Sequence, residues 1–246
     1  MAGHSKWANI KHRKGAQDAR RGKIFGKLIK EILVAAKVGD PDPAMNPRLR
    51  LAIDKAKAQS VPKDNIERAL AKASGDLQGD TYETITYEGY GPGGVAILVQ
   101  CLTDNRNRTA AEVRHAFSKG GGNLGQSGCV SYLFAQKGMF RLPAADLDEE
   151  TVMMAALEGG GEDIERADDD WLVTSAFEDY DACKRALEAL DVEVRAELTQ
   201  IPDTEVPVGD DDARGLLGLL DRLEDLDDVQ DTWTNADFDE SILEEA

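Results

Sequence analysis

The side chains with the clearest chemical potential are cations gathered at the start of the chain. Residues 1–30 hold nine Lys and Arg side chains and one acid, Asp18, although the whole protein has a net charge of −18. A dense positive segment on a negative chain favours a polyanionic partner, and nucleic acid is the usual one. The flat rings of Trp7 and His12 lie among these cations and can stack on unpaired bases. A solvated basic tail is the alternative, but we predict nucleic-acid contacts for Lys6, Trp7, Lys11, His12, Arg13, Lys14, Arg20, Arg21, Lys23, Lys27 and Lys30.

A second cationic segment joins a predicted buried strand to a predicted helix. Residues 103–109 contain Arg106 and Arg108, in a part of the chain that is otherwise poor in cations. An arginine side chain can bind phosphate oxygens through two parallel hydrogen bonds. The sequence leaves two interpretations open. Arg106 and Arg108 either form a second phosphate contact or pair with acids of the same protein.

No combination of residues in this sequence predicts catalysis. The glycine-rich run 89–94 lacks the Lys-Ser/Thr ending of a phosphate-binding loop and precedes a strand, and the run 120–125 follows a helix instead of opening one. Both runs are typical of turns that need positive φ. There is no nucleophile elbow and no His/Cys cluster with the spacing of a metal site. We therefore predict no enzyme activity, catalytic residue, metal, cofactor or small-molecule substrate.

The cysteines and the hydropathy favour a cytoplasmic protein. Cys101, Cys129 and Cys183 are odd in number and far apart, which is typical of reduced thiols in a reducing compartment. No apolar run approaches the ~20 residues that are needed to cross a bilayer. We therefore predict no membrane partner.

Three helices are predicted to carry most of the cations. Residues 1–75 have a net charge of +10, whereas residues 76–246 have a net charge of −28. From about Ala16 to Val38, apolar residues recur at three- and four-residue steps, and basic residues lie on the opposite face. Asn46 followed by proline predicts the start of a second helix, and Pro62 opens a third. Short helices must pack on one another to be stable, so we expect a basic arm and a three-helix bundle.

The middle of the chain alternates between strand and helix patterns. Strands are predicted near residues 82–90, 95–102 and 129–134. A capping-box pattern at Thr109 and Glu112 predicts the start of a helix that ends near Lys119. These elements are expected to belong to one sheet with a helix on it.

The remaining part of the chain predicts a second, smaller sheet. From residue 138 to residue 200 the expected order is β-α-β-β-α-β, with Asp146 as the cap of the first helix, and this is the ferredoxin-like arrangement. A helix near 212–226 and a strand at 229–234 cannot form a domain alone, so we expect them to return to the sheet begun at Tyr82. The predicted fold class is α+β. It comprises a bundle at 1–77, a discontinuous α+β domain at 78–136 plus 202–240, and a ferredoxin-like domain at 137–201 inserted in it.

Four stretches together resemble signature motifs of the YebC/PmpR family. The resemblance spans nearly the whole chain, and the motifs are long and specific. The departures are small, because they are confined to Gly121, where a histidine is frequent, and to the loop at residues 39–43. The matching stretches are Gly3–Lys14, Pro62–Ala69, Tyr87–Gly94 and Leu102–Thr109.

The resemblance implies three domains, with the third inserted in the second, and a non-enzymatic regulator of gene expression. Many members are named DNA-binding transcriptional regulators. Others act on translation, including the mitochondrial translational activator of cytochrome c oxidase subunit I, and some bacterial relatives associate with the ribosome and relieve stalling at proline-rich stretches. The expected partner is therefore DNA or ribosomal RNA. Physical reasoning favours RNA, because cations on an arm and one long helix suit phosphates better than base readout.

Overall fold

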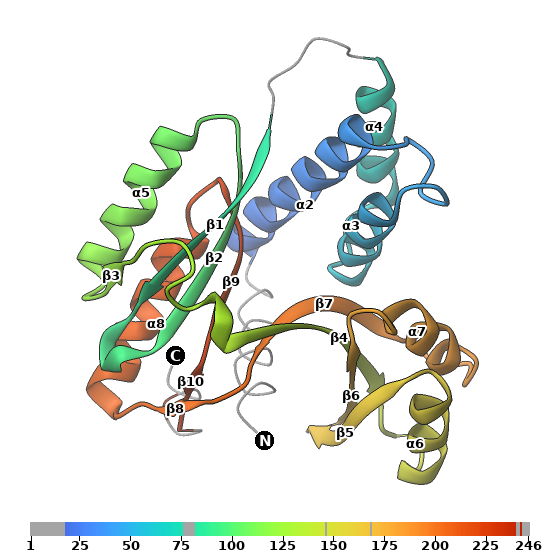
Figure 1. The fold of residues 1–246 in the computed structure, drawn as a ribbon. Helices are drawn as coiled ribbons and strands as arrows, with labels where there is room; N and C mark the ends of the chain where they lie inside the picture. The colour runs from blue at the N-terminus through green and yellow to red at the C-terminus, as the bar shows by residue number, and fades with distance from the viewer. Residues whose placement is uncertain (1–17, 76–81, 146, 168, 240–241, 243–246) are drawn as a thin grey trace. The chain divides into compact units, whose positions relative to one another are not determined.

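The structure is a computed structural model that describes residues 18–75, 82–145, 147–167, 169–239 and 242 (Figure 1). The chain divides into two compact units. Residues 1–134 and 202–246 make up the first unit, and residues 135–201 make up the second.

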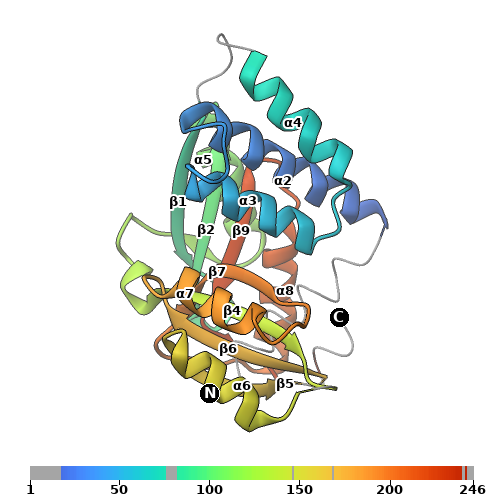
Figure 2. The ribbon, with the colours of Figure 1, turned by 90° about the vertical axis from the view of Figure 1, so that its right-hand side faces the viewer.

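The first unit begins with the predicted bundle of three helices (Figure 2). Leu28, Ile32 and Ala36 face inward on the first helix, as their spacing predicts, and the first helix packs against both of the others. The second helix starts where predicted, because the Asn46 side chain accepts a hydrogen bond from the Leu49 N–H and proline follows at the first helical position. The three helices are α2 (Asp18–Val38), α3 (Pro47–Ala58) and α4 (Lys63–Gly75).

The first unit also contains a four-stranded antiparallel sheet, in the order β3-β1-β2-β9. The last of these strands follows the second unit in sequence and pairs with β2, with Val99 opposite Thr232. The chain therefore returns to the sheet that it began near residue 83, as the sequence predicts. The strands are β1 (Glu83–Tyr90), β2 (Ala96–Thr103), β3 (Asn123–Leu124) and β9 (Val229–Thr234).

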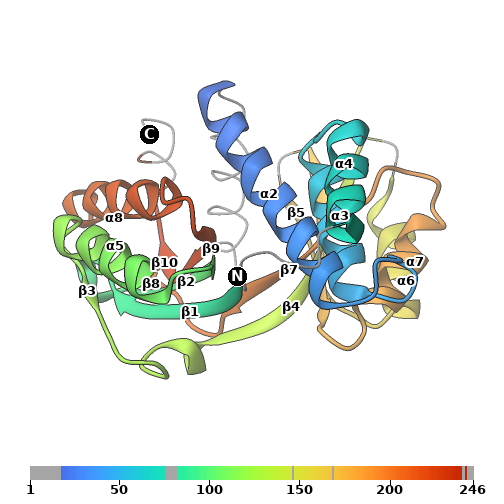
Figure 3. The ribbon, with the colours of Figure 1, turned by 90° about the horizontal axis from the view of Figure 1, so that it is seen from above.

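The two faces of this sheet have separate apolar cores. Helices α5 (Arg106–Lys119) and α8 (Asp210–Glu224) lie side by side over one face (Figure 3). Ile97 and Val99 of β2 belong to this core, together with Phe117 of α5. Alternate residues of β2, such as Leu98, pack instead with the segment around Val130. A short parallel pair is formed by β8 (Val206–Pro207), which precedes α8 in the chain, and β10 (Ala236–Asp237), which follows β9.

The second unit has the predicted β-α-β-β-α-β order. Its four strands are arranged β5-β6-β4-β7, so the first and third strands in sequence lie at the centre of the sheet, as the ferredoxin-like prediction requires. Phe140, Val152 and Leu187 are fully buried and supply its core. The elements are β4 (Phe134–Pro143), α6 (Glu149–Glu158), β5 (Gly161–Ala167), β6 (Asp170–Ala176), α7 (Tyr180–Glu188) and β7 (Arg195–Pro202).

Two element predictions in the first unit are wrong. Helix α5 starts three residues before Thr109, because Asn105 caps it by accepting a hydrogen bond from the Arg108 N–H. The segment 129–134 is not a strand, since residues 131–133 form a 3₁₀ turn, η2 (Ser131–Leu133). The Glu88 carboxylate binds the backbone N–H groups of Val130 and Ser131, which leaves those groups unavailable to a neighbouring strand.

The cap predicted for the first helix of the second unit is also wrong. Asp146 lies outside the described residues, and the cap of α6 is Asp148, which accepts a hydrogen bond from the Thr151 N–H. The cap lies two residues after the predicted one, because Asp146 and Asp148 both precede this helix and aspartate is a residue type that caps well.

Candidate nucleic-acid interface

The predicted nucleic-acid contacts fall into three groups. Six of them, from Lys6 to Lys14, lie outside the described residues. Arg20 and Arg21 belong to the first turn of α2. The other five are Lys23, Lys27, Lys30, Arg106 and Arg108, and the structure gives the surroundings of each.

Three lysines of α2, Lys23, Lys27 and Lys30, face an acidic segment that leads from α8 into β9. We call residues 224–231, with the sequence Glu-Asp-Leu-Asp-Asp-Val-Gln-Asp, the acidic turn. Lys23 Nζ lies 3.0 Å from a carboxylate oxygen of Asp225, and Lys27 Nζ donates to the Glu224 carbonyl. Lys30 Nζ donates to Asp228 at 2.9 Å and to the Leu102 carbonyl at 2.7 Å. A nucleic acid that contacts these amines would have to displace acceptors that belong to the protein.

A fourth lysine, on α3, meets the same acidic turn. Lys55 Nζ donates to a carboxylate oxygen of Asp231. Lys55 is not among the predicted contacts, and its neighbours in the sequence carry no signal for this ion pair, because the partner lies 176 residues away. The bundle and the α+β elements of the first unit are therefore joined by ion pairs from two helices.

Asp228 is the centre of this network. Asp228 is only 4% exposed. Its carboxylate accepts hydrogen bonds from Lys30 (2.9 Å) and Arg108 (2.6 Å). The hydroxyls of Thr103 and Thr109 also donate to it, at 3.1 and 2.7 Å. Burial by itself raises the pKa of Asp228, but the hydrogen bonds, led by those from Arg108 and Lys30, outweigh burial and lower the pKa to about 2. This side chain is therefore a permanent anion near neutral pH.

The two arginines of the 103–109 segment have different surroundings. Arg108 donates to Asp104 at 2.9 Å and to Asp228 at 2.6 Å, so it takes the intramolecular pairing that the sequence left open. Arg106 is exposed and has no ion-pair partner among the described residues. Burial raises the pKa of the half-buried Tyr87 hydroxyl, whereas the nearby charges of Arg106 and Arg114 act to lower it. Arg106 and Arg114 are both exposed and lie near Tyr87, as does the exposed acid Glu83.

The glycine-rich run 89–94 forms a turn, as predicted. Gly93 and Gly94 both have a φ of 74°, a backbone conformation that residues with a Cβ rarely adopt. The turn leads from β1 into β2 through the short helix η1 (Pro92–Gly94). A phosphate-binding loop needs its N–H groups at the start of a longer helix, and this run ends in a strand.

The described part of the chain offers neither a metal site nor a membrane span. Within it, no group of three or more His, Cys, Asp or Glu side chains is placed to hold a metal ion. None of its helices combines the length and the apolar character that spanning a membrane would require.

Comparison with known proteins covers almost the entire chain. Residues 5–76 match the model of the TACO1/YebC protein N-terminal domain, and residues 82–236 match the model of the TACO1/YebC second and third domain. A probable transcriptional regulatory protein of Nitrosococcus oceani is 54% identical over 245 residues, which is 99% of this chain and 98% of that protein. A protein of the same name from Idiomarina loihiensis is 55% identical over 245 residues, again 99% of this chain and 98% of that protein.

A solved structure supports the same relationship. The crystal structure of the conserved hypothetical protein Aq1575 from Aquifex aeolicus has a TM-score of 0.80 and 46% identity to this chain. The alignment covers 90% of this chain and 92% of that one. With both of its family models matched and relatives of more than 50% identity along its whole length, the chain belongs to the TACO1/YebC family.

Proposed function

We propose that this protein is a non-enzymatic regulator of gene expression that binds nucleic acid through its N-terminal basic residues. The observation that carries the proposal is the charge split, since residues 1–75 have a net charge of +10 in a chain of net charge −18. The names of its relatives, which are called probable transcriptional regulatory proteins, support a role in gene expression. The cytoplasm is the proposed compartment, because the three cysteines are unpaired as a reducing compartment favours.

The surroundings of the lysines refine which residues would bind. Lys23, Lys27 and Lys30 are engaged by the acidic turn, so we assign the main contact to the residues before them. Arg106, which is exposed, remains a candidate for a second phosphate contact, whereas Arg108 would first have to leave Asp228. The proposed main contacts are Lys6, Trp7, Lys11, His12, Arg13, Lys14, Arg20 and Arg21.

Two target classes are possible for such a site. The names of the relatives favour duplex DNA. The second candidate function is a translation factor that binds ribosomal RNA and associates with the ribosome, and one observation favours it. Reading DNA bases needs a helix that presents unoccupied side chains to the major groove. In α3, Arg48 is bound to Glu31 and Lys55 to Asp231, and both side chains are therefore poorly available for base readout.

The first experiment tests whether the basic residues bind at all. Replacing Lys11, Arg13 and Lys14 with alanine should weaken binding to all sequences and reduce the salt dependence, by about one unit of slope for each phosphate that the variant no longer neutralises. The measurement is a salt titration with a fluorescent RNA or DNA oligonucleotide. The matched control replaces three exposed cations of the same bundle, Lys57, Lys63 and Lys72, and should change the slope much less. An unchanged slope in the first variant would contradict the proposed site.

The second experiment distinguishes the two target classes. Ultraviolet cross-linking in cells, followed by sequencing of everything attached to the protein, should give reads at a few positions of ribosomal RNA if the protein acts in translation. These reads should disappear when residues 1–14 are deleted. Reads at discrete chromosomal sites would instead establish a transcriptional regulator and would contradict the preference for RNA.

A further inference from the structure

The outer face of α6, in the second unit, exposes three large apolar side chains. Met154 is 66% exposed, Leu157 65% and Met153 39%. The opposite side of the same helix is buried through Val152 and Ala155. At about 100° per residue, Met153, Leu157 and Met154 fall within about 100° of each other on the outward side. They therefore form one continuous apolar stripe, which we call the α6 stripe.

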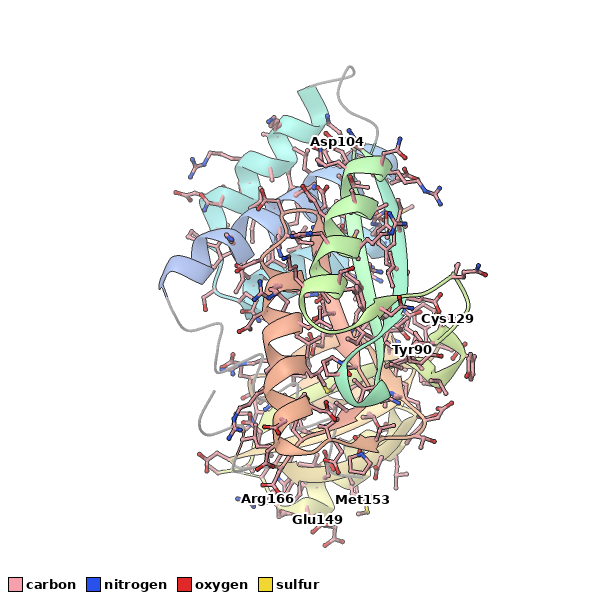
Figure 4. The ribbon with its side chains drawn as sticks, turned by 90° about the vertical axis from the view of Figure 1, so that its left-hand side faces the viewer. Tyr90, Asp104, Cys129, Glu149, Met153 and Arg166 are labelled. Carbon is pink, nitrogen blue, oxygen red and sulfur yellow. The ribbon has the colours of Figure 1, made fainter. Side chains whose placement is uncertain are left out.

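Carboxylates surround the α6 stripe. By the same helical geometry, Glu149 lies at one edge of the stripe, Glu158 lies at the other, and Glu150 lies at its N-terminal end. Figure 4 shows Glu149 and Met153 together on the outer side of the helix. All three glutamates are exposed, and none has an ion-pair partner within the described part of the chain. The stripe is thus apolar at its centre and anionic at its rim.

The charge of the second unit excludes several kinds of partner. Residues 135–201 contain six Lys and Arg residues and eighteen Asp and Glu residues, a net charge of −12. Nucleic acid and an anionic lipid surface would both be repelled by this unit. A second copy of the same stripe would place glutamates against glutamates, which is also unfavourable. A partner that matches the α6 stripe must have an apolar strip along its surface, with basic side chains on both sides of that strip.

We propose that the α6 stripe binds a basic amphipathic helix of a protein partner. The apolar side of that helix would cover Met153, Met154 and Leu157, and its Lys or Arg side chains would pair with Glu149, Glu150 and Glu158. Methionine side chains are flexible and polarizable, so they adapt to partners of different shape. This binding does not depend on the proposed nucleic-acid contacts, which lie in the first unit.

The test uses the full-length protein and a synthetic peptide as the probe. The peptide has about five helical turns, leucines along one face and lysines on both sides of it, and isothermal titration measures its binding. Replacing Met153, Met154 and Leu157 with glutamine should weaken binding about tenfold or more, equivalent to about 1.4 kcal/mol. Replacing Glu149, Glu150 and Glu158 with glutamine should weaken binding and also reduce its salt dependence.

Two controls separate this site from general attraction of a basic peptide to an acidic protein. A scrambled peptide of the same composition, which cannot form an amphipathic helix, should bind the parent protein about tenfold more weakly. Neutralising three other exposed acids of the second unit, Asp169, Glu178 and Glu188, changes the net charge equally and should leave affinity nearly unchanged. Circular dichroism checks that each variant is folded. Absence of binding to the parent, equal binding to the apolar variant, or an equal weakening in the control variant would each overturn the proposal.

Discussion

Asp228 shows how one buried carboxylate joins segments that are far apart in the sequence. Its donors come from α2, from the end of β2 and from α5, through Lys30, Thr103, Arg108 and Thr109. Hydrogen bonds to a charged acceptor are stronger than those between neutral groups. The loss of this one charge should therefore loosen both the loop after β2 and the contact of the bundle with the sheet.

Asp228→Asn should lower the free energy of unfolding at neutral pH by about 2 kcal/mol, because the pKa of Asp228 is lowered from 3.8 to about 2 in the folded protein. A depressed pKa of this kind contributes stability above about pH 4, and this contribution is lost as the pH falls towards 2. The parent protein should therefore lose stability over that range faster than Asp228→Asn does. Urea denaturation at a series of pH values measures both effects.

The control for this prediction is Asp225→Asn, which removes the same charge from the same acidic turn. The Asp225 side chain is 62% exposed and pairs with Lys23, which is 50% exposed. Such surface pairs contribute about 0–1 kcal/mol. If the two variants lose equal stability, burial of Asp228 is not what makes its network strong.

Glu88 is a second buried carboxylate, and its partners are backbone groups. One of its oxygens accepts from the Gly128 N–H at 2.7 Å, and the other accepts from Val130 and Ser131 at 2.9 and 2.8 Å. Burial raises the pKa of Glu88, but these three hydrogen bonds outweigh it and lower the pKa. The hydroxyl of the neighbouring Tyr90 donates to the Cys129 carbonyl at 3.0 Å (Figure 4), so β1 holds the 128–131 segment from two positions.

Glu88→Gln should destabilise the protein by about 1–3 kcal/mol, because the amide nitrogen of glutamine cannot accept a backbone hydrogen bond and leaves a buried N–H unpaired. Hydrogen exchange should become faster at the amides of Val130 and Ser131, and thermal denaturation should give a lower Tm. Glu83→Gln is the matched control, since Glu83 is an exposed residue of the same strand. Unchanged exchange at both amides would show that Glu88 does not hold this segment.

At the scale of elements, the connection between α2 and α3 depends on Asn46. Its Oδ1 accepts from the Leu49 N–H at 3.1 Å, and its Nδ2 donates to the carbonyls of Ala35 and Asp40 at 2.9 and 2.8 Å. The residue is 7% exposed. A Cβ at Gly39 would lie 2.5 Å from Asn46 Nδ2, so the loop has room for this side chain only because residue 39 is glycine. One asparagine therefore caps one helix and ties down the end of another.

Asn46→Ala should lower the free energy of unfolding by about 1–2 kcal/mol, since it removes an N-cap together with the hydrogen bonds from the amide to the carbonyls of Ala35 and Asp40. Chemical denaturation measures the change. Asn107→Ala is a suitable control, because Asn107 is exposed in the first turn of α5 and its replacement should cost less than about 0.5 kcal/mol. If Asn46→Ala lowers the free energy of unfolding as little as the control does, the connection between α2 and α3 is held by apolar packing alone.

At the scale of the whole molecule, the acidic side chains have different surroundings in the two units. In the first unit, Asp225, Asp228 and Asp231 pair with lysines of the bundle. In the second unit, the glutamates of α6 have no such partners among the described residues. The same net charge therefore neutralises cations in one place and, in our proposal, attracts a basic partner in another.

Replacing both Asp225 and Asp231 with asparagine should strengthen nucleic-acid binding, because Lys23 and Lys55 lose the carboxylate charges that pair with them and two charges that repel phosphate disappear. We expect an increase of about two- to tenfold and a steeper salt dependence. Fluorescence anisotropy with a labelled RNA measures both. Asp169→Asn with Glu178→Gln removes equal charge from the second unit and should have the smaller effect. If both double variants increase the affinity for RNA equally, the increase is due to net charge alone and not to the release of Lys23 and Lys55.

Much of the fold could be predicted, because its determinants are local in sequence. The apolar spacing of α2, the Asn46-Pro47 start of α3 and the ferredoxin-like order from residue 138 to residue 200 all depend on neighbours within a few residues. The predictions fail where a distant group overrides a local pattern. The 129–134 segment has the composition of a strand, but Glu88, 42 residues away from Val130, takes the N–H groups that a strand would need.

The candidate site was predictable only in its charge. The sequence alone determined that cations gather in residues 1–75 and acids in the remainder, because net charge depends on composition and position along the chain. Only the tertiary structure decided which of those cations already have partners. Lys30 and Asp228 are 198 residues apart, and no periodicity links them, since they meet only when β9 pairs with β2 and the bundle packs beside that sheet.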